Sequence, residues 1–277
     1  MKVAAIQMVS TDCVDDNLAQ AAELVGQAAG QGAELIVLPE YFCLMGQHDR
    51  DKLAIREPFG QGVLQQFLSD TAKAHGLWVV GGTLPIAAET TAHADVDARV
   101  FNSTLVFDPQ GQCVARYDKM HLFRFDNGRE RFDESRVLEP GGAPVTFDVP
   151  SRDGHRWRIG LSVCYDLRFA ELYRAYAQAG AELLLVPSAF THTTGQAHWE
   201  VLLRARAIEN LAYVVAAAQG GTHTNGRETW GQSMAIDPWG QVLAQQAQGA
   251  GVVVADLDHS KLQALRLQLP ALQHRRL

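Results

Sequence analysis

The stretch QGAELIVLP, residues 31–39, recurs with few changes as AGAELLLVP at residues 179–187. In each copy a glycine stands where a helix would end, and a short apolar run follows and stops at proline, as in a buried strand. Three further pairs of segments match in the same order along the chain: Lys2–Met8 with Arg158–Cys164, Trp78–Val80 with Tyr213–Val215, and Asp108–Gln112 with Asp237–Gln241. Each match is short, but four in register predict two similar half-domains, each presenting one sheet.

Apolar runs of strand length alternate with longer amphipathic stretches, which indicates an α/β fold. Strands are predicted at Val3–Met8, Leu35–Leu38, Trp78–Thr83, Thr104–Phe107, Cys113–Tyr117, Ile159–Cys164, Leu183–Val186, Tyr213–Ala217, Ser233–Ile236, Val242–Ala244 and Gly251–Asp256. Helices are predicted at Asn17–Ala29, Gly62–His75, Glu171–Gln178, His198–Asn210 and Ser260–Leu269. Two facing sheets with helices outside would form a four-layer αββα sandwich. We therefore predict one domain over residues 1–258 and a C-terminal tail over residues 259–277.

Charge and composition argue against several classes of function. The 277 residues include 24 Lys and Arg against 31 Asp and Glu, a net charge of −7, which disfavours nucleic acid or an anionic membrane as the main partner. We expect a cytoplasmic location, because the chain has no apolar run of membrane-spanning length and no signal peptide at its start. The four cysteines lie far apart, and neither C-x-x-C nor H-E-x-x-H occurs, so no metal site is predicted.

Three residues with catalytic potential stand where predicted strands end. Glu40 follows one strand, Lys119 follows another, and Cys164 ends a third. Ligand crevices of α/β proteins lie at the carboxyl ends of strands. Cys164 passes directly into Tyr165–Phe169 and then a helix, an elbow-like placement near a helix N-terminus that favours the thiolate. Taken singly, each residue can be explained without a catalytic role, as a buried structural residue or as a solvent-exposed one. Only the three residues together indicate a function.

The set resembles the motifs of a known family. Leu38–Glu40, Tyr117–Leu122 and Ser162–Phe169 are similar, in order and in spacing, to the three motifs of the nitrilase superfamily of carbon–nitrogen hydrolases. The resemblance runs from Val3 to about Asp256. The family has an αββα sandwich fold, which agrees with the internal duplication.

The resemblance also implies the site and the assembly. It implies a Glu–Lys–Cys triad at Glu40, Lys119 and Cys164, with a second glutamate near the site at Glu134. It implies no metal and no organic cofactor. Members of the family generally form homodimers across the helical face, and the basic stretch from Lys261 is able to cross to a partner subunit.

These residue types suit the hydrolysis of an amide, which is a poor electrophile. Glu40 would take the thiol proton as Cys164 attacks, and would then give it to the departing nitrogen. Lys119, together with a backbone N–H after Cys164, would stabilise the oxyanion of the tetrahedral intermediate. Water would then hydrolyse the thioester with Glu40 again as the base. Glu134 would orient Lys119 or the nitrogen.

Within the superfamily, Pro187–Phe190, Thr194–Glu209, Tyr213–Gln219 and the tail resemble the branch of deaminated glutathione amidases, with omega-amidases next. The first cleave the amide between 2-oxoglutarate and cysteinylglycine, and the second cleave the primary amide of 2-oxoglutaramate, so both substrates present an anionic 2-oxo acid end. Arg168 is the candidate clamp for that carboxylate, against a structural ion pair with Glu171 or Asp166. Further candidates for substrate binding are Tyr165, Phe190 and Thr194.

Other functions remain open on the sequence alone. An N-carbamoyl amine or amino-acid hydrolase would use the same triad on a ureido carbon, and a true nitrilase would act on a nitrile. A non-enzymatic interaction module is the third alternative, although the intact triad weighs against it. The expected partner is a small anionic amide, and neither a nucleic acid nor a membrane.

Overall fold

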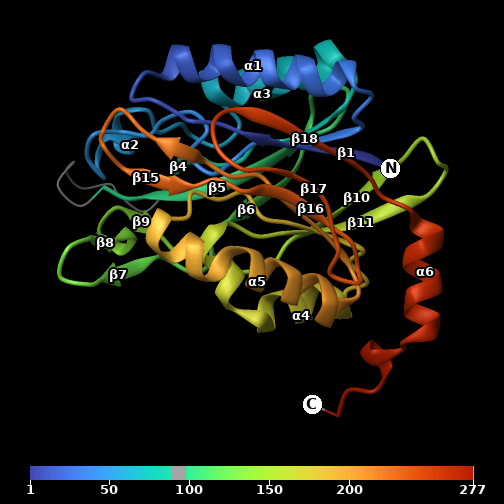
Figure 1. Cartoon of the computed structure of the whole chain (residues 1–277). Coiled ribbons are helices and arrows are strands. Elements are labelled where there is room, and N and C mark those ends of the chain that lie inside the picture. Colours follow the sequence, from blue (N-terminus) through green and yellow to red (C-terminus); the bar gives the residue numbers. More distant parts are fainter. Residues whose placement is uncertain (89–97, 277) are drawn as a thin grey trace.

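Two β-sheets lie face to face, and helices cover the outer face of each (Figure 1). The computed structural model describes residues 1–88 and 98–276. Helices α1 (Val14–Gly30) and α3 (Val63–His75) pack on one sheet, and α4 (Ala170–Gln178) and α5 (His192–Asn210) pack on the other. This is the predicted four-layer αββα sandwich. None of the described helices is both long and apolar enough to cross a membrane.

The two large sheets each contain a continuous path of paired strands. The first sheet runs β18 (Gly251–Asp256), β1 (Lys2–Gln7), β2 (Leu35–Val37), β3 (Trp78–Val80), β5 (Val100–Phe107), β4 (Leu84–Ala87), and β5 also pairs with β6 (Cys113–Asp118) and β9 (Leu138–Glu139). The second runs β10 (Thr146–Pro150), β11 (Arg156–Leu161), β12 (Leu183–Leu185), β13 (Tyr213–Ala216), β16 (Ser233–Ile236), β17 (Val242–Gln246). Two separate hairpins are β7 (Arg124–Asp126) with β8 (Arg131–Asp133), and β14 (Gly220–Thr222) with β15 (Glu228–Trp230).

The two sheets repeat one arrangement of strands, as the matching segments predict. β1, β2 and β3 are parallel neighbours, and so are β11, β12 and β13. An antiparallel strand flanks the first member of each trio, and an antiparallel hairpin flanks the third, β5–β6 in one sheet and β16–β17 in the other. Both hairpins carry a register shift just before their Asp-Pro-x-Gly turn. In these turns the carboxylates of Asp108 and Asp237 each accept two backbone N–H groups.

The alternation of side chains in β1 shows how one strand serves two cores. Val3 and Ala5 join the core between the sheets, whereas Ala4 and Ile6 face the core under α1 and α3. Burial of each large apolar side chain contributes roughly 1.5–3 kcal/mol. Because both faces of β1 are buried, its apolar run is nearly continuous, as expected for a central strand covered on both faces.

Some element boundaries differ from the predictions, for local reasons. α5 begins at His192 rather than at His198, because the Thr191 side chain caps it by accepting from Thr194 N–H at 3.4 Å. The predicted strand Trp78–Thr83 ends at Val80, since Gly82 adopts a φ of 51°, and a Cβ there would lie 2.0 Å from the Pro39 carbonyl oxygen. Elements too short to show a periodicity were missed: α2 (Asp51–Ala54), β4, β7, β8, β9, β10, β14 and β15.

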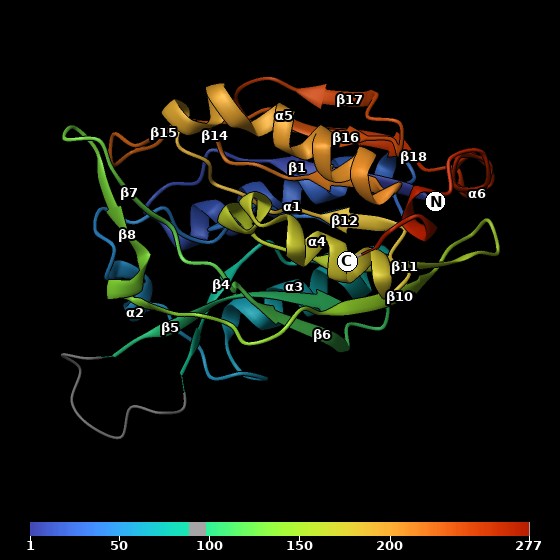
Figure 2. The same ribbon diagram turned by 90° about the horizontal axis from the view of Figure 1, so that it is seen from below.

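The C-terminal helix α6 (His259–Gln268) docks beside the second sheet, at the right of Figures 1 and 2. Leu262 is fully buried in the core. The guanidinium group of Arg266 donates to the carbonyls of Leu211 and Ala181 at 2.9 and 2.8 Å. The first part of the predicted tail is thus packed on its own chain.

Candidate active site

The strand ends bring together the three candidate catalytic residues. Glu40 follows β2 and Lys119 follows β6 in the first sheet, whereas Cys164 follows β11 in the second. Lys119 Nζ lies 2.9 Å from Glu40 Oε1, and both side chains are almost completely buried. Cys164 lines one pocket with Glu40 and Glu134. The site therefore lies between the two sheets, and each half of the chain supplies part of it.

The carboxylate of Glu40 is held by several donors. Asn102 Nδ2 and Lys119 Nζ donate to Oε1, each at 2.9 Å, and the Ala189 N–H donates to Oε2 at 2.9 Å. A carboxylate offers about four lone-pair directions, so one remains for a proton from the pocket. Glu40 is therefore both fixed in orientation and able to act as a base.

A second carboxylate, that of Glu134, holds Lys119 from the other side. The distance from Lys119 Nζ to the carboxylate is 2.8 Å. Glu134 also accepts from Phe123 N–H at 2.6 Å and from Tyr41 Oη at 3.0 Å. Burial opposes the charge of Lys119, but Glu134 and Glu40 outweigh it and raise its pKa well above the usual value. Burial likewise opposes ionisation of Glu134, yet the Lys119 ammonium holds its pKa below the usual value.

Cys164 has the strained backbone of a nucleophile elbow. Its φ is 49°, in a region that non-glycine residues rarely adopt, and it opens a 3₁₀ helix over Cys164–Arg168. Its own N–H donates to the Pro187 carbonyl at 2.9 Å. The next N–H, that of Tyr165, has no acceptor within the part of the chain that the structure describes. This donor directly follows the candidate nucleophile in the chain, as the second oxyanion donor predicted from the sequence does.

The sequence-based expectation that the thiolate of Cys164 is favoured was wrong. Burial and the neighbouring Glu40 carboxylate raise its pKa well above the usual value, although Lys119 acts in the opposite direction. The 3₁₀ helix has only five residues, so its dipole is too small to compensate. The resting nucleophile is therefore a neutral thiol.

Asp166 fixes the elbow from within the protein. This fully buried carboxylate accepts from Val163 N–H at 2.8 Å and Tyr117 Oη at 2.7 Å. It also accepts from His121 N–H at 3.1 Å and lies 2.7 Å from His121 Nδ1. His121 stacks on Phe169, with ring centroids 3.6 Å apart, which agrees with a structural role for this histidine.

All four predicted substrate-binding residues line the pocket at Cys164, namely Tyr165, Arg168, Phe190 and Thr194. The predicted alternative of an ion pair between Arg168 and Glu171 or Asp166 does not form. Instead, the Arg168 guanidinium lies over the rings of Tyr165 and Phe190 and lies 3.2 Å from His198 Nδ1. No carboxylate neutralises it within the described residues, so it can bind an anion.

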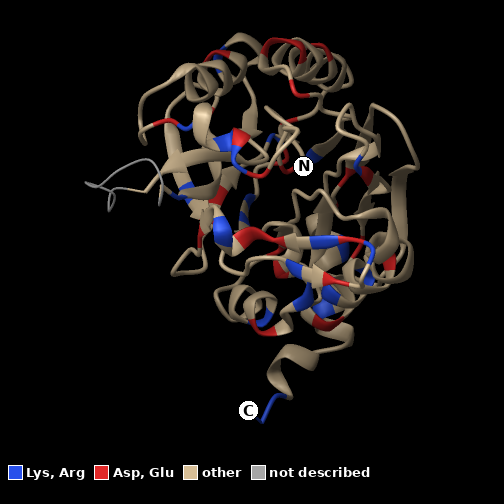
Figure 3. Ribbon diagram, turned by 90° about the vertical axis from the view of Figure 1, so that its left-hand side faces the viewer, with Lys and Arg blue, Asp and Glu red and all other residues tan. Residues whose placement is uncertain are grey.

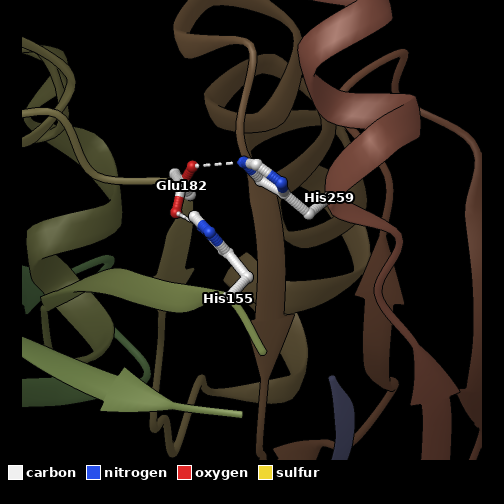
Figure 4. A group of neighbouring side chains, drawn as sticks. All are labelled: His155, Glu182 and His259. Atoms are coloured by element: carbon white, nitrogen blue, oxygen red, sulfur yellow. Dashed lines mark hydrogen bonds and ion pairs between the residues drawn. The ribbon is translucent and has the colours of Figure 1, made fainter. Parts of the chain in front are cut away.

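One cluster outside the pocket has donor atoms that a metal could use. His155 Nε2 lies 2.7 Å from one oxygen of Glu182, and His259 Nε2 lies 3.3 Å from the other (Figure 4). The two imidazole rings stack with centroids 3.5 Å apart. Sequence spacing could not reveal this group, because its members are far apart in the chain. Both carboxylate oxygens are already engaged, and the contacts explain how α6 is held against the second sheet.

A larger cavity of about 480 Å³ adjoins the pocket, and Arg227 lines both. Its walls come from the loop that precedes α2 (residues 41–49), Lys52 of α2, the β7–β8 hairpin, the turn before β15 and the start of α5. These elements lie at the end of the sandwich opposite α6 (Figures 1 and 2). Basic and acidic residues are interspersed across that end rather than separated (Figure 3).

A family model described as carbon-nitrogen hydrolase matches residues 2–267. The chain belongs to the carbon–nitrogen hydrolase family. The resemblance read from the three motifs is thereby confirmed.

Relatives of this carbon–nitrogen hydrolase include two human amidases. The Homo sapiens protein named deaminated glutathione amidase is 42% identical over 275 residues, which cover 99% of this chain and 82% of the relative. The Homo sapiens omega-amidase NIT2 is 38% identical over 278 residues, covering 99% and 95%. The crystal structure of Saccharomyces cerevisiae Nit3, described as a member of branch 10 of the nitrilase superfamily, has a TM-score of 0.86 and 29% identity, covering 100% and 97%.

Sequence reasoning missed several residues of this carbon–nitrogen hydrolase that surround the candidate triad. Tyr41 and Asp166 are close to Glu40 and Cys164 in the sequence, but nothing in the sequence showed what they would contact. Asn102 lies in the middle of β5, where an amide on a buried strand was the only signal. Lys52 and Arg227 come from a short helix and a turn, and their convergence on one cavity depends on tertiary structure.

Proposed function

We propose that this carbon–nitrogen hydrolase is an amidase that cleaves deaminated glutathione into 2-oxoglutarate and cysteinylglycine through a thioester on Cys164. The observation that carries the proposal is the buried contact of Lys119 with Glu40 beside the pocket that Cys164 lines. A cation, a base and a thiol placed in this way suit acyl transfer.

In the first half-reaction the Cys164 sulfur attacks the amide carbon while Glu40 takes the thiol proton. The negative charge moves to the amide oxygen, next to the Lys119 ammonium and the free Tyr165 N–H. Collapse of the intermediate breaks the carbon–nitrogen bond, and Glu40 returns the proton to the departing nitrogen. Loss of one oxyanion donor commonly costs about 10²–10³-fold in kcat.

In the second half-reaction water attacks the thioester carbon, and Glu40 takes a proton from that water. The carbon–sulfur bond then breaks, the acid product leaves, and the thiol of Cys164 is restored. Glu134 acts on neither step directly. By bonding Lys119 Nζ at 2.8 Å it keeps that ammonium charged and in position throughout the cycle.

Support for the substrate comes from the relatives and from Arg168. Relatives named deaminated glutathione amidase match almost the whole chain, and Arg168 offers an unpaired guanidinium to the 2-oxo acid end. The pocket that Cys164 lines has a volume of about 10 Å³, roughly that of one water molecule. Entry of the acyl arm therefore requires side chains that line this pocket to move.

A second candidate function is that of an omega-amidase on 2-oxoglutaramate, because a relative of that name matches at 38% identity. Turnover of the two amides should be compared side by side, with released 2-oxoglutarate detected by a coupled dehydrogenase and Cys164→Ala as the control. We expect a preference for deaminated glutathione. A preference for 2-oxoglutaramate would establish the second candidate, and release from neither would favour an N-carbamoyl substrate.

We also propose a homodimer. Large apolar side chains are exposed on α5, namely Val201 and Ile208, and on α6, namely Leu267. Pairing of these faces would remove them from water. Light scattering at micromolar concentration should give twice the chain mass of 30.3 kDa, and a monomeric mass would refute the dimer.

A further inference from the structure

We propose that the cavity beside the candidate active site binds the leaving group of the substrate, and that Lys52 and Arg227 bind a carboxylate on that group. The inference rests on the proposed amidase function and assigns the chemistry of the departing amine. The cavity has a volume of about 480 Å³, within the range of small-molecule sites. It adjoins the pocket of Cys164 through their shared residue, Arg227.

Arg227 is a cation without an anionic partner in the described chain. Its Nη2 donates to the Ala189 carbonyl at 3.0 Å, and its guanidinium lies 5.3 Å from the centre of the Phe132 ring. Its Nε is buried and has no hydrogen-bond partner among the described residues. Ala189 also donates its N–H to Glu40. Ala189 therefore contacts both the Arg227 guanidinium and the candidate base. A buried donor without a partner costs about 1–3 kcal/mol, which a bound anion would offset.

Lys52 on α2 is the second such cation. Its ammonium lies 4.9 Å from the centre of the Tyr41 ring, and no hydrogen bond or ion pair joins it to the described residues. Burial lowers its pKa, although Glu134 and Asp49 act in the opposite direction. A carboxylate placed between Lys52 and Arg227 would restore the balance of charge at both groups.

Two of the three acidic residues that line the cavity, Asp49 and Glu228, are exposed, whereas Lys52 and Arg227 are half-buried. The third, Glu130, is half-buried as well and accepts a hydrogen bond from the Thr193 hydroxyl at 3.0 Å. The two cations are therefore more shielded from solvent than most of the acidic residues, which strengthens their attraction for the negative end of a ligand.

The two proposed anion sites correspond in number to the two carboxylates of the proposed substrate. Deaminated glutathione carries one carboxylate on its 2-oxo acid end and another on its terminal glycine. Two extended residues span about 7 Å from the scissile nitrogen to that glycine carboxylate. Arg168 serves the first carboxylate on one side of Cys164, and Lys52 and Arg227 serve the second in the cavity. A substrate that releases ammonia, such as 2-oxoglutaramate, makes no use of the cavity.

The test measures how the ratio of kcat/KM for deaminated glutathione to kcat/KM for 2-oxoglutaramate changes in Lys52→Met and Arg227→Met. Each variant should lower this ratio by about 10-fold to 100-fold, mainly through KM for deaminated glutathione, as expected for one charge-assisted hydrogen bond. Lys73→Met, which removes an exposed lysine from α3, is the charge-matched control and should keep the ratio of the wild type.

A second measurement needs no variant. For the wild-type enzyme, kcat/KM for deaminated glutathione should be at least about 10-fold higher than kcat/KM for its analogue with an amidated glycine carboxylate. In both variants the difference between these two values of kcat/KM should be smaller. Normal turnover with an unchanged ratio in both variants, or equal turnover of acid and amidated analogue, would overturn the leaving-group site alone. Absence of turnover of both amides by the wild type would overturn the proposed function, and this inference with it.

Discussion

Replacement of Asp166 by Asn tests how far the elbow depends on one buried carboxylate. Asp166 accepts from Val163 N–H, Tyr117 Oη and His121 N–H, and it also contacts His121 Nδ1. An asparagine has the same shape, but one of its two terminal atoms is a donor. If its oxygen keeps Val163 N–H and Tyr117 Oη, its amide group faces His121 N–H, and a buried donor is left without an acceptor.

The expected loss of stability follows from that geometry. One unsatisfied buried donor costs about 1–3 kcal/mol, and the remaining bonds lose their charge assistance, so Asp166→Asn should destabilise by about 2–4 kcal/mol. The control is Asp148→Asn, which breaks only a partly exposed ion pair with Arg158 at 3.0 Å and should cost less than about 1 kcal/mol. Urea unfolding followed by fluorescence would compare the midpoints at an unchanged m-value.

Activity should fall with stability in Asp166→Asn. The Val163 N–H bond orients the residue that precedes Cys164, so relaxation of the positive φ at Cys164 moves its sulfur away from the oxyanion donors. We expect kcat to fall by at least about 10-fold under conditions where the variant is fully folded. A variant as stable as Asp148→Asn, with wild-type kcat, would refute the assignment of Asp166 as the support of the elbow.

Three further predictions concern the site. Because burial and Glu40 raise the pKa of Cys164, alkylation by iodoacetamide should keep accelerating above pH 9 in the wild type. Glu40→Gln removes the negative charge beside the thiol and should move the midpoint of the pH dependence of alkylation to lower pH. An unchanged midpoint would contradict the effect of Glu40 on the pKa of Cys164. Cys164→Ala should keep the wild-type fold by circular dichroism and lose all turnover. Turnover should survive Ala replacement of the other cysteines, Cys13, Cys43 and Cys113. Turnover by Cys164→Ala would exclude the mechanism. Glu134→Gln should lower kcat by about 10-fold to 10²-fold with a smaller change in KM, because Lys119 loses one of its two carboxylate partners; an unaltered kcat would rule out that support.

The repeated frame could be predicted from the sequence because its signals are local. The copies at Gln31–Pro39 and Ala179–Pro187 contain the glycine, the apolar run and the proline that define a helix end and a buried strand. The two Asp-Pro-x-Gly turns depend only on neighbouring residues, and both form in the two matching segments. Because the two halves have the same order of elements, each is expected to form one sheet, and the two sheets are expected to pack face to face.

The surroundings of the triad could not be predicted in the same way. The pKa of Cys164 depends on burial and on Glu40, which is far away in the chain, so the local helix argument gave the wrong sign. Asn102 reaches Glu40 only because β5 lies beside β3 and β2 in the same sheet. Lys52 and Arg227 converge from elements too short to have a periodicity. Partners of this kind are fixed by tertiary packing.

The match between the two halves also shows where they have diverged. In the aligned copies Met8 stands where the second half has Cys164, and Ser188 stands where the first half has Glu40. The place that would mirror the active site is instead closed: Met8 is fully buried, and Gln219 bonds Ser10 across the sheets at 2.7 and 3.0 Å. One of the two equivalent positions holds the candidate nucleophile, and its counterpart holds a buried contact between the two sheets.

The separation of the candidate triad from the walls of the large cavity affects how such a chain can change its substrate. The frame of paired strands holds the candidate triad, but much of the wall of the large cavity comes from the loop before α2, from Lys52 and from the β7–β8 hairpin, which lie outside the two repeated trios of strands. Insertions of this kind can be lengthened, shortened or recharged while both sheets keep their pairing. Substrates with new leaving groups can therefore be accommodated, in evolution or by engineering, without changes to the residues proposed to break the carbon–nitrogen bond.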